Sequence, residues 1–407
     1  MGLGKTYVGS EKMMELGKNV NLLICQKSKV NDWVQHFKEY YDEFPYLTEL
    51  YDLTDKKDFE RFMQISNEDY SERLDPCYYV GIINYELAFR RKNLLDLRDF
   101  TLTLDESSMI QNESAKRSKF ILKLKAQNVI LLSGTPTSGK YENLYSQLKL
   151  LGWNISKDLY WNQYVDSEWI DQDGFFRRQV NGYKNVDRLK QKLRQHGAVF
   201  MKSEEVFDLP EQIFNKVMVP VSKEYKKFMR SSIITIEEKE LVGDTTLTKR
   251  LYARMLCGHY NKDKLEAFMD IVESTSDRLI VFYNFNDELA AMTALIEDKP
   301  ISIINGSVKD LEAYENYDDS ITFVQYQAGA MGLNLQKANK IIYFTLPQSS
   351  ELFEQSKKRT HRIGQNNTCF YYYLMCEKSV EEDILQTLEM RRDYSDELFK
   401  KHESEYQ

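Results

Sequence analysis

The start of the chain carries residues whose types and spacing suit the binding of a polyphosphate. These residues are Gly2, Leu3, Gly4, Lys5 and Thr6. Glycines let backbone N–H groups approach phosphate oxygens, and the N-terminus of a following helix adds positive potential. In such a loop the lysine reaches the β and γ phosphates of a nucleoside triphosphate, and the threonine hydroxyl binds Mg²⁺. The Gly-Lys-Thr tripeptide alone occurs by chance in about one chain of this length in five, so the motif needs support from others.

Two adjacent carboxylates, Asp105 and Glu106, follow the alternating apolar strand pattern at 100–104. In open α/β sheets, ligands bind at the carboxyl ends of the strands, so Asp105 is placed to hold a phosphate-bound Mg²⁺. Glu106 could then polarise an attacking water molecule. An isolated Asp-Glu pair is more often an ordinary junction between a strand and a helix. The catalytic interpretation therefore depends on the other motifs.

A turn of small and hydroxyl-bearing residues, Ser133, Gly134 and Thr135, follows the apolar run at 129–132. We expect this turn to lie beside the acidic pair on a neighbouring strand and to relay the state of the nucleotide. Taken by itself, the pattern predicts only a turn.

A basic segment far along the chain places Gln355, Arg359 and Arg362 at positions i, i+4 and i+7, which predicts one face of a helix. An arginine that reaches a γ-phosphate from another lobe stabilises the charge of the transition state and raises the rate by about 10³ to 10⁵. The alternative is a solvated basic helix, because further lysines and a histidine are interspersed.

The elements that must position these residues follow from the hydrophobic pattern. Short apolar runs alternate with helical patterns, which predicts an α/β protein with parallel sheets flanked by helices. The strands predicted in the first half span 20–25, 78–83, 100–104 and 129–132. Those predicted in the second half span 278–283, 301–304, 321–325, 340–344 and 368–374. The aromatic run at 370–373 fits a buried strand better than a surface on which bases stack.

The length of 407 residues favours two or three domains. We expect an N-terminal lobe at 1–208, a connector with helices at 209–260 and a C-terminal lobe at 261–407. Within the connector, charged patterns predict helices at 222–241 and 245–257. The segment at 152–195, rich in Trp and Tyr, is expected to be an excursion of the first lobe.

The composition excludes several classes of protein. With 42% hydrophobic residues the chain is not disordered, and a net charge of -8 excludes a uniformly basic coat for nucleic acid but not a local basic groove. Five cysteines without a C-x-x-C pair argue against a zinc site or a disulfide framework, so we expect buried thiols. Apolar runs are far shorter than the ~18 residues of a membrane span, and no export signal is present. We therefore expect a cytoplasmic protein.

In this order, the four motifs make the chain resemble the ATPase core of the Swi/Snf (sucrose-non-fermenting) family within helicase superfamily two. The resemblance extends from residue 1 to about 388. The segments that resemble motifs of the family are 23–26 with Trp33, 83–86, 105–112, 132–136, 208–210, 280–282, 329–335 and 355–365. The last two are specific to this family.

The resemblance implies two RecA-like lobes, with ATP and Mg²⁺ in the cleft between them and double-stranded DNA across both. Members typically translocate on duplex DNA without separating its strands. Gly332 would take part in nucleotide binding, and affinity for DNA phosphates would be salt-dependent and independent of sequence. The residues expected to contact DNA are Asn84, Tyr85, Gln327, Gly329 and Asn334.

The chain also departs from the family pattern. It begins at Met1, inside the phosphate-binding loop, whereas the family has an apolar strand and a base pocket before this loop. We therefore expect either a truncated reading frame or weakened, base-indifferent binding of nucleotide. Ser108 replaces the usual histidine, which would loosen the coupling between nucleotide and DNA. Gln327 stands where an Arg or Lys often occurs, so DNA affinity and its salt dependence should be lower than usual. The compact size resembles phage or bacterial relatives.

The leading hypothesis is a DNA-stimulated ATPase that translocates on duplex DNA, with replication or recombination proteins as possible partners. One alternative is a strand-separating helicase, whose pin would come from the segment around Trp153, Trp161 and Trp169. Another is a nucleotide-gated DNA clamp that has weak or lost ATPase activity. Because both halves of the ATP site would lie on one chain, we expect a monomer, and we expect no membrane partner.

Overall fold

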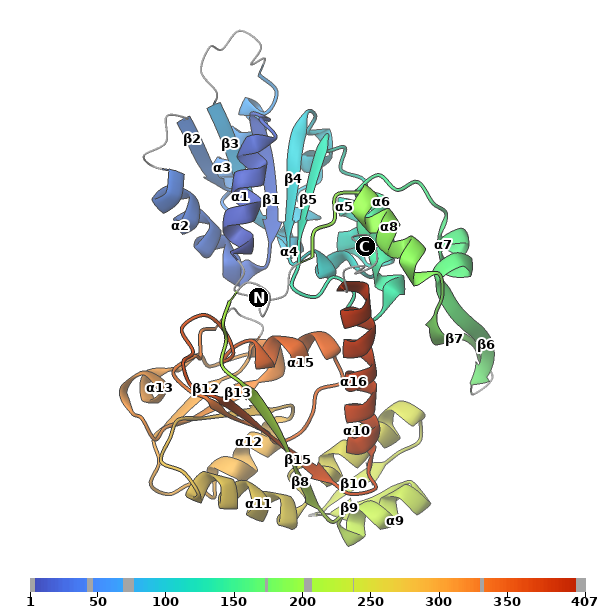
Figure 1. Cartoon of the computed structure of the whole chain (residues 1–407), viewed down its shortest axis with the longest axis vertical. Helices are drawn as coiled ribbons and strands as arrows, with labels where there is room; N and C mark the ends of the chain where they lie inside the picture. The colour runs from blue at the N-terminus through green and yellow to red at the C-terminus, as the bar shows by residue number, and fades with distance from the viewer. Residues whose placement is uncertain are drawn as a thin grey trace, which may run out of the picture. The chain divides into compact units, whose positions relative to one another are not determined.

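The computed structural model describes residues 4–41, 47–68, 77–172, 175–200, 207–236, 238–329 and 333–399. The chain divides into two compact units, one of Met1–Met201 with Asp393–Gln407 and one of Lys202–Arg392. Each unit is built on its own sheet, and the predicted α/β class with parallel sheets is confirmed (Figure 1). Residues 209–260, expected to form a connector, fall within the second unit.

The first unit contains a five-stranded sheet of order β2-β3-β1-β4-β5, in which every described pairing is parallel. Its strands are β1 (Val20–Cys25), β2 (Leu47–Asp52), β3 (Cys77–Asn84), β4 (Phe100–Asp105) and β5 (Asn128–Leu132). Strands β1, β3 and β4 are almost entirely buried, including the threonines that alternate with apolar residues in β4, whereas β5 ends the sheet and is mostly half-buried. β2 was not among the predicted strands.

Helices cover both faces of the first sheet because alternate residues of each strand point to opposite sides. Leu23 and Cys25 pack with Trp33 of α2 (Val30–Tyr41) and with α1 (Lys5–Glu15). Leu22 and Ile24 point to the other face, where they join the core with α3 (Lys56–Ile65) and α5 (Lys116–Ile121). A short helix, α4 (Tyr85–Ala88), follows β3 directly.

The aromatic excursion of the first unit has a small core of its own. It contains α6 (Tyr145–Leu150), α7 (Lys157–Tyr164), the antiparallel hairpin of β6 (Val165–Gln172) and β7 (Phe175–Tyr183), and α8 (Val186–Gln195). Tyr141, Tyr160, Tyr164 and Leu189 are fully buried in this core. Helix and hairpin alternate too quickly here for either periodicity to be visible in the sequence.

The second unit contains a six-stranded parallel sheet of order β12-β13-β11-β14-β15-β8. Its strands are β8 (Gln212–Val219), β11 (Leu279–Tyr283), β12 (Ile301–Ile304), β13 (Ile321–Gln325), β14 (Lys340–Tyr343) and β15 (Cys369–Cys376). Tyr371 and Tyr373 of β15 are buried, so the aromatic run is a core strand as predicted. The helices are α11 (Lys262–Glu273), α12 (Asn286–Thr293), α13 (Glu312–Asn316), α14 (Tyr326–Gly329), α15 (Ser350–Lys357) and α16 (Val380–Phe399).

The segment between β8 and α11 differs from the prediction. The expected helix at 222–241 is wrong: α9 (Lys223–Ser231) stops before Ser232, which has φ 60°, and the hairpin of β9 (Ile233–Ile236) and β10 (Lys239–Val242) follows. Ile234 and Leu241 of the hairpin are buried against α9 and α10 (Thr246–Cys257). Burial of these β-branched and apolar side chains outweighs the helical pattern of the charged residues.

No helix within the described ranges is both long enough and apolar enough to cross a membrane.

Candidate functional site

Lys5 and Glu106 meet at the carboxyl end of the first sheet. Lys5 Nζ lies 2.8 Å from Glu106 Oε1, and both side chains are largely buried. Lys5 is the first residue of α1, and Gly4 before it has φ 67°, a left-handed conformation that glycine adopts without strain. The structure therefore brings together two residues that the sequence assigned to one site. Gly2 and Leu3 lie outside the described residues.

Glu106 is held in an unusual conformation for a residue with a side chain. Its backbone has φ 54° and ψ 60°, where non-glycine residues are uncommon. The hydroxyl of Tyr85, which is fully buried, donates to the carbonyl oxygens of Asp105 at 2.9 Å and Glu106 at 3.4 Å. Glu106 Oε2 is buried and has no hydrogen-bond partner among the described residues. One carboxylate oxygen of Glu106 is thus engaged by Lys5, and the other is free to accept a proton or bind a cation.

Asp105 accepts a hydrogen bond at Oδ2 from Trp33 Nε1, at 3.0 Å. Burial raises the pKa of Asp105 above its ordinary value; the Trp33 hydrogen bond opposes this rise and the neighbouring Glu106 adds to it. A nearby cation stabilises the ionised form of a carboxylate that burial disfavours. Its oxygen donors and the hydroxyl of Thr6, the second residue of α1, are of the kind that Mg²⁺ prefers, so the residues present fit a magnesium site.

The turn after β5 is linked to the acidic pair through one buried amide. Gln147 on α6 accepts from Ser107 Oγ at 2.9 Å and donates from Nε2 to the Pro136 carbonyl at 2.7 Å. Ser107 directly follows the acidic pair, and Pro136 directly follows the predicted coupling residues Ser133, Gly134 and Thr135. Sequence reasoning missed Gln147, because a glutamine in a short helix carries no signal of its role.

The turn itself is ordered by its own hydroxyl groups. Ser133 Oγ accepts from the backbone N–H of Thr135 at 3.1 Å. Thr135 Oγ1 is buried and lacks a hydrogen-bond partner within the described part of the chain. Asp105 on β4 pairs with Leu132 on β5, and the turn begins at the next residue, Ser133. The turn therefore starts beside the acidic pair.

Of the first-unit residues expected to contact DNA, Tyr85 does not fit that role. Its side chain is fully buried and its hydroxyl is bonded to the backbone of the acidic pair, so this prediction is wrong for the side chain. The reason is that Tyr85 begins α4 directly after β3 and points into the core below the sheet. Asn84, the last residue of β3, is mostly buried and donates from Nδ2 to Glu86 at 3.0 Å.

The second-unit residues Gln355, Arg359 and Arg362 do not share one helical face, so that prediction is wrong. Helix α15 ends at Lys357, and only Gln355 lies within it. Gln355 is buried and donates from Nε2 to Glu351 at 3.2 Å. Arg359 follows the helix and is also buried, and its backbone oxygen accepts from Leu335 at 3.1 Å.

Contacts outside the helix explain why α15 stops. The ring of His361 is bonded through Nε2 to the Pro210 carbonyl at 2.7 Å. Gln365 donates from Nε2 to the carbonyls of Gln336 at 3.0 Å and Ala338 at 2.9 Å. These contacts attach the segment after α15 to the loops before β8 and β14 instead of letting the helix continue.

Arg362, predicted to take part in catalysis, contacts Asn334, predicted to contact DNA. An η nitrogen of Arg362 donates to Asn334 Oδ1, and Asn334 itself is exposed. Gln327 is likewise exposed, on α14 at the carboxyl end of β13. Gly329 is the last residue of α14, and Gly332 lies outside the described residues.

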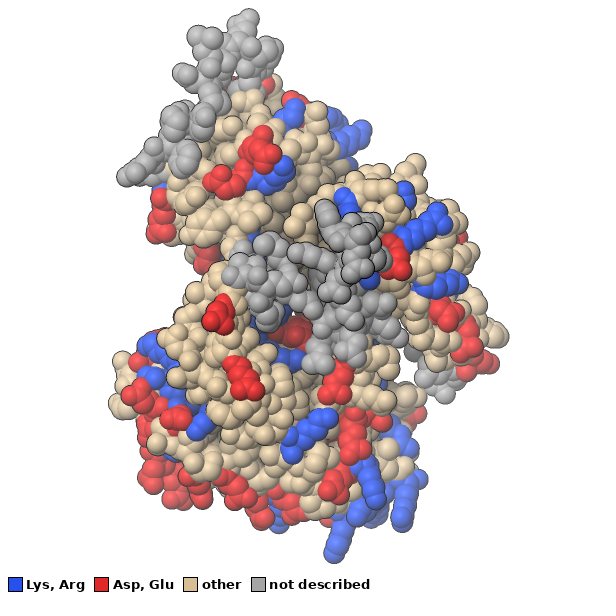
Figure 2. All heavy atoms as spheres, viewed as in Figure 1, with Lys and Arg blue, Asp and Glu red and all other residues tan. Residues whose placement is uncertain are grey.

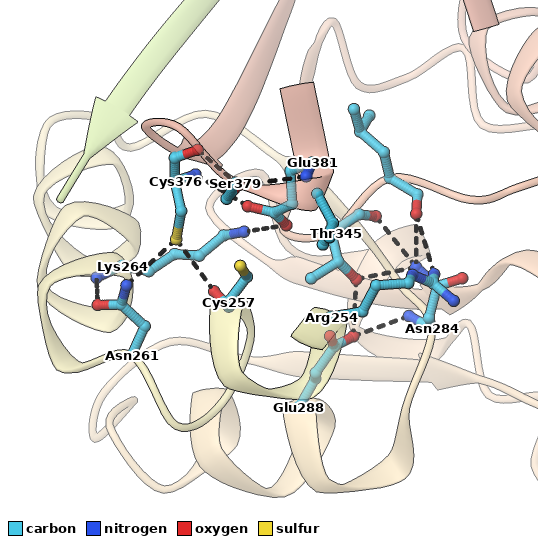
Figure 3. Close-up of polar contacts among 12 residues, drawn as sticks. Arg254, Cys257, Asn261, Lys264, Asn284, Glu288, Thr345, Cys376, Ser379 and Glu381 are labelled. Carbon is cyan, nitrogen blue, oxygen red and sulfur yellow. Dashed lines mark hydrogen bonds and ion pairs between the residues drawn. The ribbon is translucent and has the colours of Figure 1, made fainter. Parts of the chain in front are cut away.

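A buried polar network orders the carboxyl ends of the central strands in the second unit (Figure 3). Asn284, just after β11, donates from Nδ2 to Thr345 Oγ1 at 2.8 Å and to the Leu346 carbonyl at 3.2 Å. Glu288 Oε2 accepts from the backbone of Asn284 and from Thr345 Oγ1, at 2.9 and 3.0 Å. Arg254 of α10 donates to the Leu346 carbonyl at 3.1 Å. Sequence reasoning missed this network, since its members are far apart in the chain.

A second buried group beside this network has potential metal ligands. Cys257, Cys376 and Glu381 place one ligand atom each within 4.8 Å of one another. The Glu381 carboxylate is already engaged, however, because Lys264 Nζ lies 2.6 Å from its Oε1 and the backbone N–H of Cys376 donates to its Oε2 at 2.9 Å (Figure 3). The group is therefore a structural ion pair, and all five cysteines of the chain are buried.

Models of known protein families match both halves of the chain. A family model described as an SNF2-related domain matches residues 1–264, and one described as a helicase conserved C-terminal domain matches residues 263–364.

Similar curated proteins are considerably longer than this chain. The putative ATP-dependent helicase/translocase YwqA of Bacillus subtilis is 24% identical over 334 residues, which cover 73% of this chain and 35% of YwqA. The mouse DNA annealing helicase and endonuclease ZRANB3 is 26% identical over 412 residues, covering 94% of this chain and 37% of the relative. The chain thus spans little more than a third of the length of these proteins.

A search of solved structures found the Sulfolobus solfataricus SWI2/SNF2 ATPase core in complex with dsDNA. It is 19% identical, with a TM-score of 0.41, and the match covers 97% of this chain and 86% of that one.

Proposed function

Because the chain belongs to the family of SNF2-related domains, we propose that it is an ATP hydrolase that is stimulated by duplex DNA and translocates along it. The observation that carries the proposal is the contact of Lys5 Nζ with Glu106 Oε1 at 2.8 Å, directly beside Asp105. A phosphate-binding lysine, a metal-binding aspartate and a candidate base for water are the three groups that this hydrolysis requires.

Lys5, Thr6 and Asp105 would hold the nucleotide and its metal. Bound Mg²⁺ would neutralise charge on the phosphate oxygens. Lys5 would turn from Glu106 to the β and γ phosphates, and Gly4 would let the backbone approach them. Once Lys5 has turned, both oxygens of Glu106 can accept hydrogen bonds from water, so the carboxylate can orient the nucleophile and take up its proton.

Arg359 and Arg362 would supply positive charge to the transition state from the second lobe. In this proposal ATP binds in the cleft between the two RecA-like lobes, and Gly332 and Gln355 contribute to that site. Arg362 supports the idea because its guanidinium donates to the neutral amide of Asn334, and no carboxylate pairs with it among the described residues. Its guanidinium is therefore available for a phosphate oxygen.

Duplex DNA would be held by phosphate contacts from both lobes. Gln327 and Asn334 are exposed polar residues, and Asn84 and Gly329 complete the proposed set. These residues are neutral, so they would position the duplex by hydrogen bonds, which adds little salt dependence. The buried link from Ser107 through Gln147 to Pro136 is the proposed route by which the nucleotide site and the Ser133–Thr135 turn influence each other.

A strand-separating helicase is the second candidate, because the β6–β7 hairpin exposes two aromatic side chains. Trp169 is 67% exposed and Phe176 is 75% exposed. Asp171 is paired with Phe176 and lies on the same face of the hairpin as Trp169, so both aromatic residues occupy one face. Exposed rings of this kind could stack on a base at a strand junction. This candidate would be favoured if the wild type unwinds a forked duplex and Trp169→Ala abolishes the unwinding but retains ATP hydrolysis.

The test of the proposed function is phosphate release from ATP without DNA, with single strands and with duplex. We expect duplex to stimulate hydrolysis, and Lys5→Ala and Arg362→Ala to abolish it. Lys12→Ala is the matched control, because Lys12 lies on the same helix as Lys5 and, within the described part of the chain, its exposed side chain forms an ion pair only with Glu15, at 2.9 Å. Duplex binding without hydrolysis in any condition would contradict the proposal and favour a DNA-binding clamp.

A further inference from the structure

Helix α9 (Lys223–Ser231) carries a stripe of positive charge that none of the motifs above uses. Its four cations are Lys223, Lys226, Lys227 and Arg230, and its single acid is Glu224. All four cationic residues are exposed, and none has an ion-pair partner among the described residues. Figure 2 shows Lys and Arg side chains projecting from the part of the second unit that Figure 1 labels α9, β9 and β10.

The four cations lie on one side of the helix. Their spacing is i, i+3, i+4 and i+7, and at 3.6 residues per turn this places them within an arc of about 100°. Tyr225 and Phe228 occupy the opposite side and are buried. The stripe, from Lys223 to Arg230, is about 10.5 Å long at 1.5 Å per residue.

The helix that carries the stripe is firmly placed. Ser222 caps its N-terminus by accepting from the backbone N–H of Tyr225 at 3.1 Å. The Tyr225 hydroxyl accepts from the backbone N–H of Val380 at 3.0 Å, at the start of α16. The stripe is therefore a fixed array of charges rather than a set of positions on a frayed segment.

This arrangement is unfavourable for the isolated helix. Pairs of like charge at i, i+3 and i, i+4 destabilise a helix, and the four cations form four such pairs. A solvated helix face normally interleaves the two signs. The chain as a whole carries a net charge of -8, so the stripe is not a consequence of a basic composition. An anionic ligand along the stripe would remove this repulsion.

We propose that the α9 stripe binds the phosphate backbone of duplex DNA, as a contact surface additional to the motifs of the two lobes. This inference rests on the proposed function for its choice of polyanion. Phosphates of one DNA strand follow one another every 3.4 Å along the helix axis, so the stripe spans about three of them. Lysine and arginine side chains at this spacing would release condensed counterions, which supplies affinity without sequence preference.

The test compares the salt dependence of duplex binding by the full chain and two matched double variants. Lys226→Gln/Lys227→Gln removes two adjacent exposed lysines from the stripe. Lys56→Gln/Lys57→Gln removes two adjacent exposed lysines from α3 in the first unit, outside any proposed DNA contact. Each lost phosphate contact should reduce the slope of log K against log salt by about 0.9, or affinity by about eightfold at 0.1 M salt.

We expect the α9 variant to lose up to about 60-fold in affinity at 0.1 M salt, with the slope reduced by up to about 1.8. The α3 variant should keep the slope of the wild type, and hydrolysis of ATP without DNA should be unchanged in both. If the wild type binds duplex and all three proteins show the same slope, the α9 stripe does not bind DNA, and the proposed function is unaffected. Failure of the wild type to bind duplex at any salt concentration would instead overturn the proposed function.

Discussion

The ammonium of Lys5 lies 2.8 Å from Oε1 of Glu106, although 101 positions separate the two residues in the chain. The contact exists because α1 begins, and β4 ends, at the same edge of the first sheet. It couples the group that would bind phosphate to the group that would activate water.

Glu106→Gln should therefore separate the binding of ATP from its hydrolysis. Glutamine keeps an oxygen that can accept from Lys5 but cannot take up a proton from water. We expect a fall of at least about 100-fold in kcat, with ATP affinity changed little, as measured by phosphate release and by titration with a fluorescent nucleotide. Asp96→Asn is the control, because it also replaces a carboxylate by an amide in the first unit, at a position after strand β3. Loss of binding and hydrolysis together would contradict the assigned role of Glu106.

Gln147→Leu should weaken the coupling between DNA and hydrolysis. Leucine fills a similar volume but leaves the Ser107 hydroxyl and the Pro136 carbonyl without their buried partner. Such a loss costs about 1–3 kcal/mol of stability. The informative measurement is the ratio of duplex-stimulated to basal hydrolysis, which a purely structural defect would leave unchanged. We expect that ratio to fall, and an unaltered ratio would remove Gln147 from the proposed route.

Lys264→Met should destabilise the second unit strongly. Lys264 and Glu381 form an ion pair of 2.6 Å in which both side chains are almost completely buried. Removing one partner leaves a buried charge without its counter-ion, which typically costs about 3–5 kcal/mol. Urea unfolding should show this loss. The double variant Lys264→Met/Glu381→Gln should recover part of it, because no charge is then buried, and additive losses in the double variant would contradict the explanation.

Glu288→Gln should change how stability depends on pH. Burial raises the pKa of Glu288, although hydrogen bonds from Asn284, Phe285 and Thr345 oppose the rise. The folded chain therefore retains a proton in a pH range where the unfolded chain has released it. The unfolding free energy of the wild type falls as pH rises through that range.

The glutamine variant lacks this titration, so its stability relative to the wild type should increase from about pH 4 to pH 7. Urea midpoints of both proteins across this range measure the difference. A difference that is constant with pH would show that the pKa of Glu288 is the same in the folded and unfolded chains, so that burial does not raise it.

The sequence alone determined the family and the α/β class of this protein. Apolar runs predicted β1, β3 and β5 and most strands of the second sheet, and the alternating pattern at 100–104 predicted β4, because strands that helices cover on both faces are rich in apolar residues. The motifs from Lys5 to the segment around Arg362 indicated an SNF2-like ATPase core, and the family models matching residues 1–264 and 263–364 confirm that resemblance.

The hairpin strands and β8 were decided by tertiary structure. β8 mixes polar and apolar residues over Gln212–Val219 without a regular period and becomes a strand by pairing with β15 along its whole length. β9 and β10 lie in a segment whose charges suit a helix, and they pair because Ile234 and Leu241 are buried against neighbouring helices. Local preference is weak compared with such burial, so no local pattern could reveal these strands.

The site divides in the same way. Residue type and spacing were sufficient to select Lys5, Asp105 and Glu106, because phosphate and metal chemistry demands those groups. The roles of Trp33 and Gln147 depend on contacts across 72 and 40 residues of sequence, and the course of the chain after α15 depends on the bond between His361 and Pro210. Chemistry restricts which residue types a site contains, whereas the partners of each residue are set by long-range packing that a single sequence does not display.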